Sequence, residues 1–163
     1  MNKKKDTILS HIDEHEKASM VDIHEKNISK RKAIASSKVF LNDTSYKLLK
    51  KNKSKKGDIL NTARIAGIMA SKKTSELIPL CHQLNLENVD ISYIFHDSEN
   101  LIIVKSTSIA SDKTGVEMEA LVATTIASLT IYDMLKAVDK KIKISDIWLD
   151  YKDGGRSGKF VRD

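Results

Sequence analysis

The sequence contains one cysteine, Cys81, one tryptophan and only 5% aromatic residues in 163 positions. One cysteine excludes a disulfide within the chain. It also argues against a structural zinc site, because such a site needs four protein ligands and no second cysteine or spaced histidine pair accompanies Cys81. The scarcity of aromatic side chains argues against the base-stacking platforms that many RNA-binding domains use.

Long uninterrupted apolar runs are also missing. The most apolar segment, residues 116–138, is broken by threonine, serine, aspartate and lysine, so we expect no membrane span. The basic start MNKKKDTILSHIDEHEK has no apolar core of the length that a signal peptide needs. We therefore expect a cytoplasmic protein that does not use a membrane.

Lysine dominates the charge balance of the chain. There are 28 lysines and arginines against 22 aspartates and glutamates, a net charge of +6. This excess favours an anionic partner, and leaves nucleotide, nucleic acid and simple solvation open. Residues 1–18 are polar and charged, which predicts a disordered tail, followed by a single domain over 19–163. The lysine-rich segment 47–58 predicts the end of a helix followed by a mobile basic loop.

Hydrophobic periodicity predicts alternating strands and helices. Period-two or apolar runs predict strands at 33–40, 89–95, 101–110 and 142–151. Helical stripes predict helices at 58–73, with Asp58 as the N-cap, and at 116–138. The order strand, helix, strand, strand, helix, strand is that of a ferredoxin-like domain. We therefore expect an α+β fold with an antiparallel sheet and helices packed on one face.

The helix expected at 116–138 is apolar on nearly all sides. A sheet can cover only one side of such a helix, and the remaining apolar surface then needs another subunit. Small residues along the helix, such as Ala123 and Ala127, would let a neighbouring helix approach closely. The sequence therefore predicts an oligomer.

The same helix carries charged residues at both ends. Glu117 and Glu119 at its head either complement the helix dipole or serve a site. Asp133 and Lys136 at its tail share one face, as a structural ion pair or as a desolvated acid–base couple. At 1.5 Å per residue, Glu119 and Asp133 are about 21 Å apart along the axis. A small-molecule site that uses both must therefore lie between subunits.

Two further segments carry candidate chemistry. In IPLCHQL, Cys81 is either a small buried apolar residue or a nucleophile, and His82 is a candidate acid–base or phosphate-contacting group. The segment DGGRSGK combines three glycines with Arg156 and Lys159, so it is either an anion-binding loop or a flexible C-terminal tail. It lacks the spacing of a P-loop.

Four segments together closely resemble the molybdenum-cofactor biosynthesis protein C (MoaC) family. They are MVDIHEKNISKRKAIAS, KGDILNTARIAGIMASKKTSELIPLCHQL, DKTGVEMEALVATTIASLTIYDMLKAVDK and KDGGRSG, within a resemblance from about Met20 to Lys159. The resemblance implies a ferredoxin-like fold, a hexamer built as a trimer of dimers, and sites at subunit interfaces. The implied reaction converts (8S)-3′,8-cyclo-7,8-dihydroguanosine 5′-triphosphate, made by a radical-SAM enzyme, into cyclic pyranopterin monophosphate and pyrophosphate. No metal or organic cofactor is implied.

The resemblance also assigns roles to individual positions. The implied catalytic residues are Asp133, Lys136, Lys56 and His82. The implied substrate-binding residues are Leu80, Cys81, His82, Glu117, Met118, Glu119, Lys72, Lys152, Arg31, Lys26 and Asp22. This chain departs from the family pattern at Gln83, where CHQL replaces the usual CHPL, and at Arg156, where the family more often has lysine.

Two other functions remain as alternatives. One is a ferredoxin-like nucleic-acid-binding module that uses a basic surface. Against it, Tyr93 and Phe95 alternate with Val89 and Ile91, which predicts core positions and not a base-stacking cluster. The other is a purely structural oligomer, which does not explain why charges recur along an apolar helix.

Overall fold

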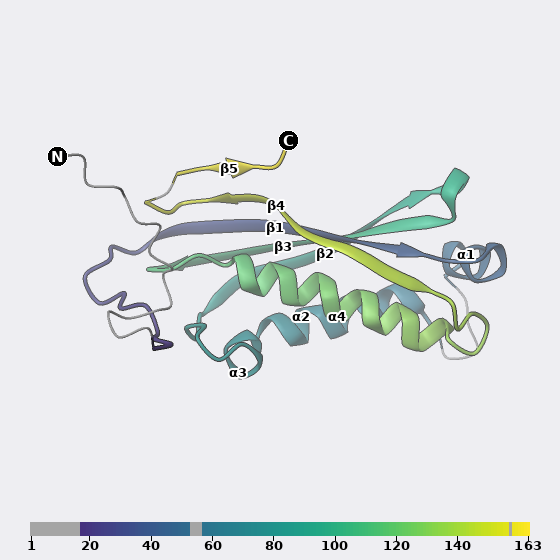
Figure 1. The fold of residues 1–163 in the computed structure, drawn as a ribbon, viewed down its shortest axis with the longest axis horizontal. Coiled ribbons are helices and arrows are strands. Elements are labelled where there is room, and N and C mark those ends of the chain that lie inside the picture. Colours follow the sequence, from purple (N-terminus) through teal and green to yellow (C-terminus); the bar gives the residue numbers. More distant parts are fainter. Residues whose placement is uncertain (1–16, 53–56, 157) are drawn as a thin grey trace.

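One antiparallel sheet with helices beneath a single face makes up the structure, a computed structural model that describes residues 17–52, 57–156 and 158–163 (Figure 1). The elements in chain order are β1 (Ser29–Phe40), α1 (Asp43–Lys50), α2 (Ile59–Ser71), α3 (Thr74–Leu77), β2 (Leu86–His96), a 3-10 turn (Asp97–Glu99), β3 (Leu101–Asp112), α4 (Glu117–Leu135), β4 (Lys143–Asp153) and β5 (Phe160–Val161). The predicted α+β class and antiparallel sheet are confirmed.

The strand order places three chain segments at one end of the sheet. The order is β2-β3-β1-β4-β5, with β1 between β3 and β4. Ser29 at the start of β1 pairs with Asp112 at the end of β3. Lys32 pairs with Asp153 at the end of β4. The head of α4 follows β3 directly, so it reaches the same end of the sheet.

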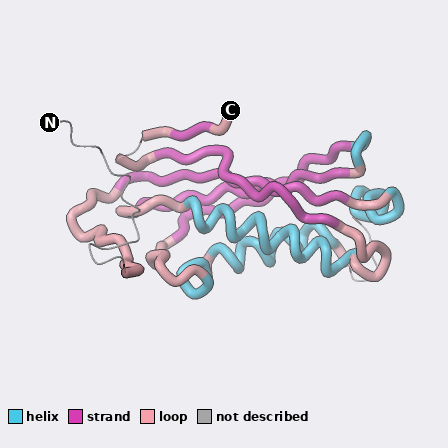
Figure 2. Tube along the Cα trace, in the orientation of Figure 1, coloured by secondary structure: helices cyan, strands magenta, loops and turns pink. Residues whose placement is uncertain are grey.

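Helices α2 and α4 lie side by side under the sheet (Figure 2). Asp58 caps α2 as predicted, because its side chain accepts a hydrogen bond from the Asn61 amide. Gly67 allows the close approach of the helices, since a Cβ there would lie 2.7 Å from the Ala123 carbonyl oxygen.

The predicted alternation along β2 is confirmed. Ile91 is fully buried, and Val89, Tyr93 and Phe95 pack against the same core. The Tyr93 hydroxyl donates a hydrogen bond to the Leu60 carbonyl oxygen at 2.8 Å. These two aromatic side chains therefore lie in the core, as the alternation indicated.

Helix α4 is shorter than the sequence predicted, because it ends at Leu135 and not near residue 138. By length and composition alone α4 could cross a membrane, but half of it is buried in the position of a core helix. Its main contacts are with α2 and with strands β1, β3 and β4. Leu129 nevertheless remains 49% exposed, so one protomer leaves part of the apolar helix surface open.

The ends of the sheet also differ from the prediction. β1 begins at Ser29, and β4 continues to Asp153, because the two strands pair with each other and with their neighbours to that point. A short strand, β5, forms where a loop or tail was expected, since Phe160 and Val161 pair with the edge of β4. Most of the expected tail at 1–18, and residues 53–56 of the basic loop, lie outside the described residues.

Candidate active site

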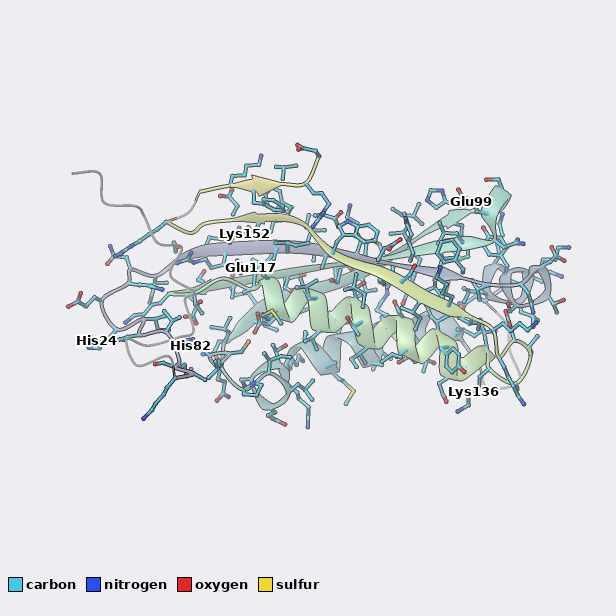
Figure 3. The ribbon with its side chains drawn as sticks, in the orientation of Figure 1. His24, His82, Glu99, Glu117, Lys136 and Lys152 are labelled. Atoms are coloured by element: carbon cyan, nitrogen blue, oxygen red, sulfur yellow. The ribbon has the colours of Figure 1, made fainter. Side chains whose placement is uncertain are left out.

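A pocket of about 860 Å³ opens at the sheet end where β1 starts and β3 and β4 end. Figure 3 shows His82, Glu117 and Lys152 gathered at this end of the molecule. The lining residues come from segments far apart in the chain. They are Val21, Lys26, Asn27, Ser29, Arg31, Leu80, Cys81, His82, Leu84, Lys113, Thr114, Gly115, Glu117, Met118, Glu119, Lys152, Asp153, Gly154, Gly155, Arg156 and Gly158.

Arg31 organises the turn between β3 and α4. Arg31 is only 8% exposed, and its guanidinium donates from Nε to the Asp112 carbonyl oxygen at 3.0 Å and from Nη2 to the Lys113 carbonyl oxygen at 3.1 Å. The family resemblance implied that Arg31 is a substrate-binding residue. In this structure two of its donor groups hold the backbone of the turn, so Arg31 lines the pocket and also shapes it.

Glu117 and Lys152 form an ion pair inside the pocket. Lys152 Nζ donates to Glu117 Oε1 at 3.0 Å, and the two side chains are 34% and 27% exposed. Gly115 makes room for this arrangement, because a Cβ at that position would collide with the Glu117 carboxylate. The pair joins the head of α4 to the end of β4.

Glu119 is the buried acid of the pocket, with 4% exposure. Burial raises the pKa of its carboxyl to about 7, and the neighbouring charges of Glu117 and Asp112 also raise it. A carboxyl with such a pKa can both give and accept a proton near neutral pH. The helix-dipole interpretation therefore does not suffice for Glu119, because a carboxylate that only served the dipole would be solvated and ionised.

Cys81 and His82 lie half-buried on the pocket wall. Burial raises the pKa of the Cys81 thiol, and the charge of Glu119 raises it further. A thiol with a raised pKa is a poor nucleophile near neutral pH, so the structure favours Cys81 as a wall residue. Within the described ranges, no group of three or more histidine, cysteine, aspartate or glutamate side chains is arranged to hold a metal ion.

The pocket carries more cations than acids. Its cationic residues are Lys26, Arg31, Lys113, Lys152 and Arg156, and its acidic residues are Glu117, Glu119 and Asp153. With Glu119 partly protonated near pH 7, the balance is more positive still. Such a pocket attracts an anionic ligand with several charges.

Sequence reasoning missed Lys113 and did not assign Arg156 to the site. Lys113 Nζ donates to the His24 carbonyl oxygen at 2.8 Å and so ties the N-terminal segment to the pocket. Its place in the family segment DKTGVEMEA, just before the helix expected at 116–138, was a signal that could have found it. Arg156 belongs to the segment DGGRSGK, which the sequence alone could not assign to either an anion-binding loop or a flexible tail.

Several implied site residues lie elsewhere. Asp133 and Lys136 are at the tail of α4, and Figure 3 shows Lys136 at the opposite end of the molecule from Glu117. Lys136 Nζ and Asp133 Oδ1 are 2.6 Å apart, which confirms the predicted pairing, but the side chains are 52% and 57% exposed. The hydrogen bond that Lys136 donates to the Asp133 carboxylate raises the pKa of Lys136. One protomer therefore does not desolvate this couple.

Two further implied residues, Asp22 and Lys72, also lie outside the pocket lining. Asp22 accepts a hydrogen bond from the His24 amide at 2.8 Å, in the segment before β1. Lys72 is exposed at the end of α2. Lys56 falls outside the described residues.

Comparison with known proteins gives consistent matches along the chain. The MoaC family model matches residues 20–155. The cyclic pyranopterin monophosphate synthase of Campylobacter jejuni (strain RM1221) is 48% identical over 154 residues, covering 94% of this chain and 98% of the relative. The protein of the same name from Staphylococcus aureus (strain bovine RF122 / ET3-1) is 45% identical over 159 residues, covering 96% and 97%. The family match spans nearly all the described pocket residues.

Proposed function

The chain belongs to the MoaC family, and on that premise we propose that it is a cyclic pyranopterin monophosphate synthase. As a lyase of molybdenum-cofactor biosynthesis, it converts (8S)-3′,8-cyclo-7,8-dihydroguanosine 5′-triphosphate, the product of a radical-SAM enzyme, into cyclic pyranopterin monophosphate and pyrophosphate. One observation carries this proposal. A pocket with five cationic residues also holds a buried carboxyl whose pKa is about 7, in a chain that matches such enzymes over nearly its whole length.

The pocket can supply both kinds of catalysis that this reaction requires. Forming the cyclic phosphate expels pyrophosphate, so cations such as Lys152 and Lys26 must balance negative charge that develops on the phosphates. Rebuilding the purine-derived ring into a pterin requires several proton transfers. Glu119 is suited to these transfers because its pKa lies near neutral pH, and His82 faces the same pocket.

We further propose that a neighbouring copy completes the site. Asp133 and Lys136 lie at the far end of α4 and are half exposed, so contact with another protomer would desolvate them. The outer surfaces of the helices support such contact, because Ile65 and Met69 on α2 are 52% and 58% exposed, as is Leu129 on α4 at 49%. The assembly proposed is a cytoplasmic hexamer, a trimer of dimers, in which Lys56, Lys72 and Asp22 also belong to the shared site.

The ferredoxin-like assignment belongs to the same proposal. The order β2-β3-β1-β4, with α2 and α4 on one face of the sheet, supports it. β5 is then an addition at the β4 edge. In this arrangement the N-terminal end of α4 lies at the pocket, and its C-terminal end is available to complete the site of a neighbouring copy.

The direct test is to incubate the purified protein with the cyclic triphosphate and to measure cyclic pyranopterin monophosphate and released pyrophosphate. Equal amounts of the two products are expected. Binding of the substrate without either product would show that the pocket recognises the nucleotide but that the chain is not this lyase. Salt-sensitive RNA binding in place of turnover would favour a nucleic-acid-binding module.

A further inference from the structure

The turn that follows β4 is held against the first residue of β1. Ser29 Oγ donates a hydrogen bond to the Gly154 carbonyl oxygen at 2.6 Å, across 125 positions of sequence. Gly154 has a φ of +94°, and a side chain there would collide with the Lys30 carbonyl oxygen. The Gly154 amide donates to Asp153 Oδ1 at 2.7 Å. The turn therefore lies directly on the β1 backbone, and the Ser29 hydroxyl holds it there beyond the last strand pair, Lys32 with Asp153.

This turn carries cationic side chains on both sides of Gly154. Lys152, before it, is already paired with Glu117 inside the pocket. Arg156, after it, lines the pocket and is exposed. Within the part of the chain that the structure describes, the Arg156 guanidinium makes no hydrogen bond or ion pair, so its donors are open to a ligand. What places Arg156 relative to the pocket is therefore the backbone of the turn.

We propose that Ser29 is a positioning residue for the phosphate chain of the substrate, because its hydroxyl fixes the turn over residues 153–156 and so presents Arg156 to the pocket. The proposal rests on the proposed function and extends it to a residue outside the implied site. Because the Ser29 hydroxyl donates its proton to the Gly154 carbonyl oxygen, Ser29 acts through the turn and not as a donor to the substrate. Without this bond the turn would have to be ordered when substrate binds, which weakens binding and leaves the chemical step unchanged.

Two variants isolate the hydroxyl group. Ser29→Thr keeps it, while Ser29→Val has nearly the shape of threonine without it. Loss of one hydrogen bond of about 1 kcal/mol corresponds to roughly a fivefold change in binding. We expect Ser29→Val to raise KM about fivefold with kcat within about twofold of wild type, and Ser29→Thr to behave as wild type. Tripolyphosphate, used as a probe in calorimetry, should bind Ser29→Val more weakly by the same factor.

A double-mutant cycle with Arg156→Gln tests whether Ser29 acts through Arg156. Arg156→Gln alone should raise KM, and adding Ser29→Val should raise it little further, because the turn then has no guanidinium to present. Should Ser29→Val unfold, as its melting temperature will show, Ser29→Ala takes its place. An equal KM for the threonine and valine variants, a fall in kcat alone, or an undiminished effect in the Arg156→Gln background would each overturn the proposal. A wild-type protein that neither turns over substrate nor binds tripolyphosphate would instead overturn the proposed function.

Discussion

At the scale of single residues, the surroundings of Glu119 strongly change the proton affinity of its carboxyl. Its carboxyl is nearly inaccessible, and burial raises its pKa from the ordinary value of 4.5 to about 7. The negative charges of Glu117 and Asp112 act in the same direction. Glu119 therefore holds its proton over the pH range in which an ordinary glutamate has lost it, as a residue that donates and recovers protons must.

The raised pKa of Glu119 makes the stability of the protein depend on pH. The folded chain binds this proton more tightly than the unfolded chain does, so the stabilisation is complete below pH 4.5 and is lost as the pH rises through about 7. Glu119→Gln cannot ionise. Its stability relative to wild type should therefore increase by roughly 3 kcal/mol between pH 4 and pH 8, measured by urea unfolding. Glu87→Gln, at an exposed position of β2, is the matched control, and an equal increase in that variant would contradict the prediction.

The second prediction at this scale concerns the turnover of variants of Asp133 and Lys136. If they are the acid–base couple of the reaction, Asp133→Asn or Lys136→Ala should lower turnover at least about 100-fold. The molar mass of the assembly should not change, because we expect the exposed apolar residues of α2 and α4, and not this ion pair, to hold the copies together. Lys140→Ala, an exposed lysine beyond the helix, should keep full activity. A fully active Asp133→Asn/Lys136→Ala double variant would remove the pair from the mechanism.

At the scale of elements, the contact between α2 and α4 sets the position of the pocket acids. The two helices approach so closely that Gly67 faces the backbone of α4 at Ala123. The same helix presents Ser128 to Ser37 of β1, through a hydroxyl contact of 2.7 Å. α4 is thus held from two sides, and its first turn, with Glu117 and Glu119, is held with it.

Substitution of Gly67 by alanine tests this close packing. Alanine favours a helix by about 1 kcal/mol, but its Cβ would lie 2.7 Å from the Ala123 carbonyl oxygen, which cannot move without α4. Overpacking of this kind typically costs about 1–3 kcal/mol, so we expect a net loss of about 1 kcal/mol in thermal unfolding. Asn61→Ala, at an exposed position of α2, should not destabilise the protein. A Gly67→Ala variant more stable than wild type would show that the helices can separate freely.

At the scale of the whole molecule, the main feature is that implied site residues lie at opposite ends of α4. Glu119 lies in the pocket at the head of the helix, and Lys136 lies just beyond its tail. No motion within a continuous helix can bring these two side chains together. Under the proposed shared site, the exposed apolar residues on α2 and α4 belong to the surface where another copy supplies the missing end.

Mixing two inactive variants tests the shared site. The Lys136→Ala protomer retains Glu119, and the Glu119→Gln protomer retains Lys136. A mixed pair of protomers therefore contains one site in which both residues are present. Random assembly of equal amounts should restore about a quarter of the wild-type activity. The two variants are unfolded together and refolded, with each refolded alone as the control. No recovery in a mixed oligomer, or full activity in a protein that is monomeric by light scattering, would contradict the shared site.

Much of the local structure followed from sequence pattern alone. The alternation of Val89, Ile91, Tyr93 and Phe95 predicted β2 and its buried face, and Asp58 was identified as the cap of α2. These features depend on side chains a few positions apart in the chain. Such side chains determine the secondary structure and the buried face of one element without contacts from distant segments. The end of α4 was placed too late, because apolar residues continue past Leu135 where the helix itself stops.

The sequence by itself determined the four long strands, the helices α2 and α4, and their order. Through the quoted family segments it also identified the residues that we expect to act. Only the tertiary structure decided which of these residues lie in the same pocket. It buried Glu119 and raised its pKa, directed the Arg31 guanidinium to two backbone carbonyls, and joined Ser29 to Gly154. It also left Asp133 and Lys136 outside the pocket. The reason is physical: periodicity records which face of an element is buried, whereas contacts between distant segments, and the pKa values that depend on them, arise only when strand register and helix packing bring those segments together.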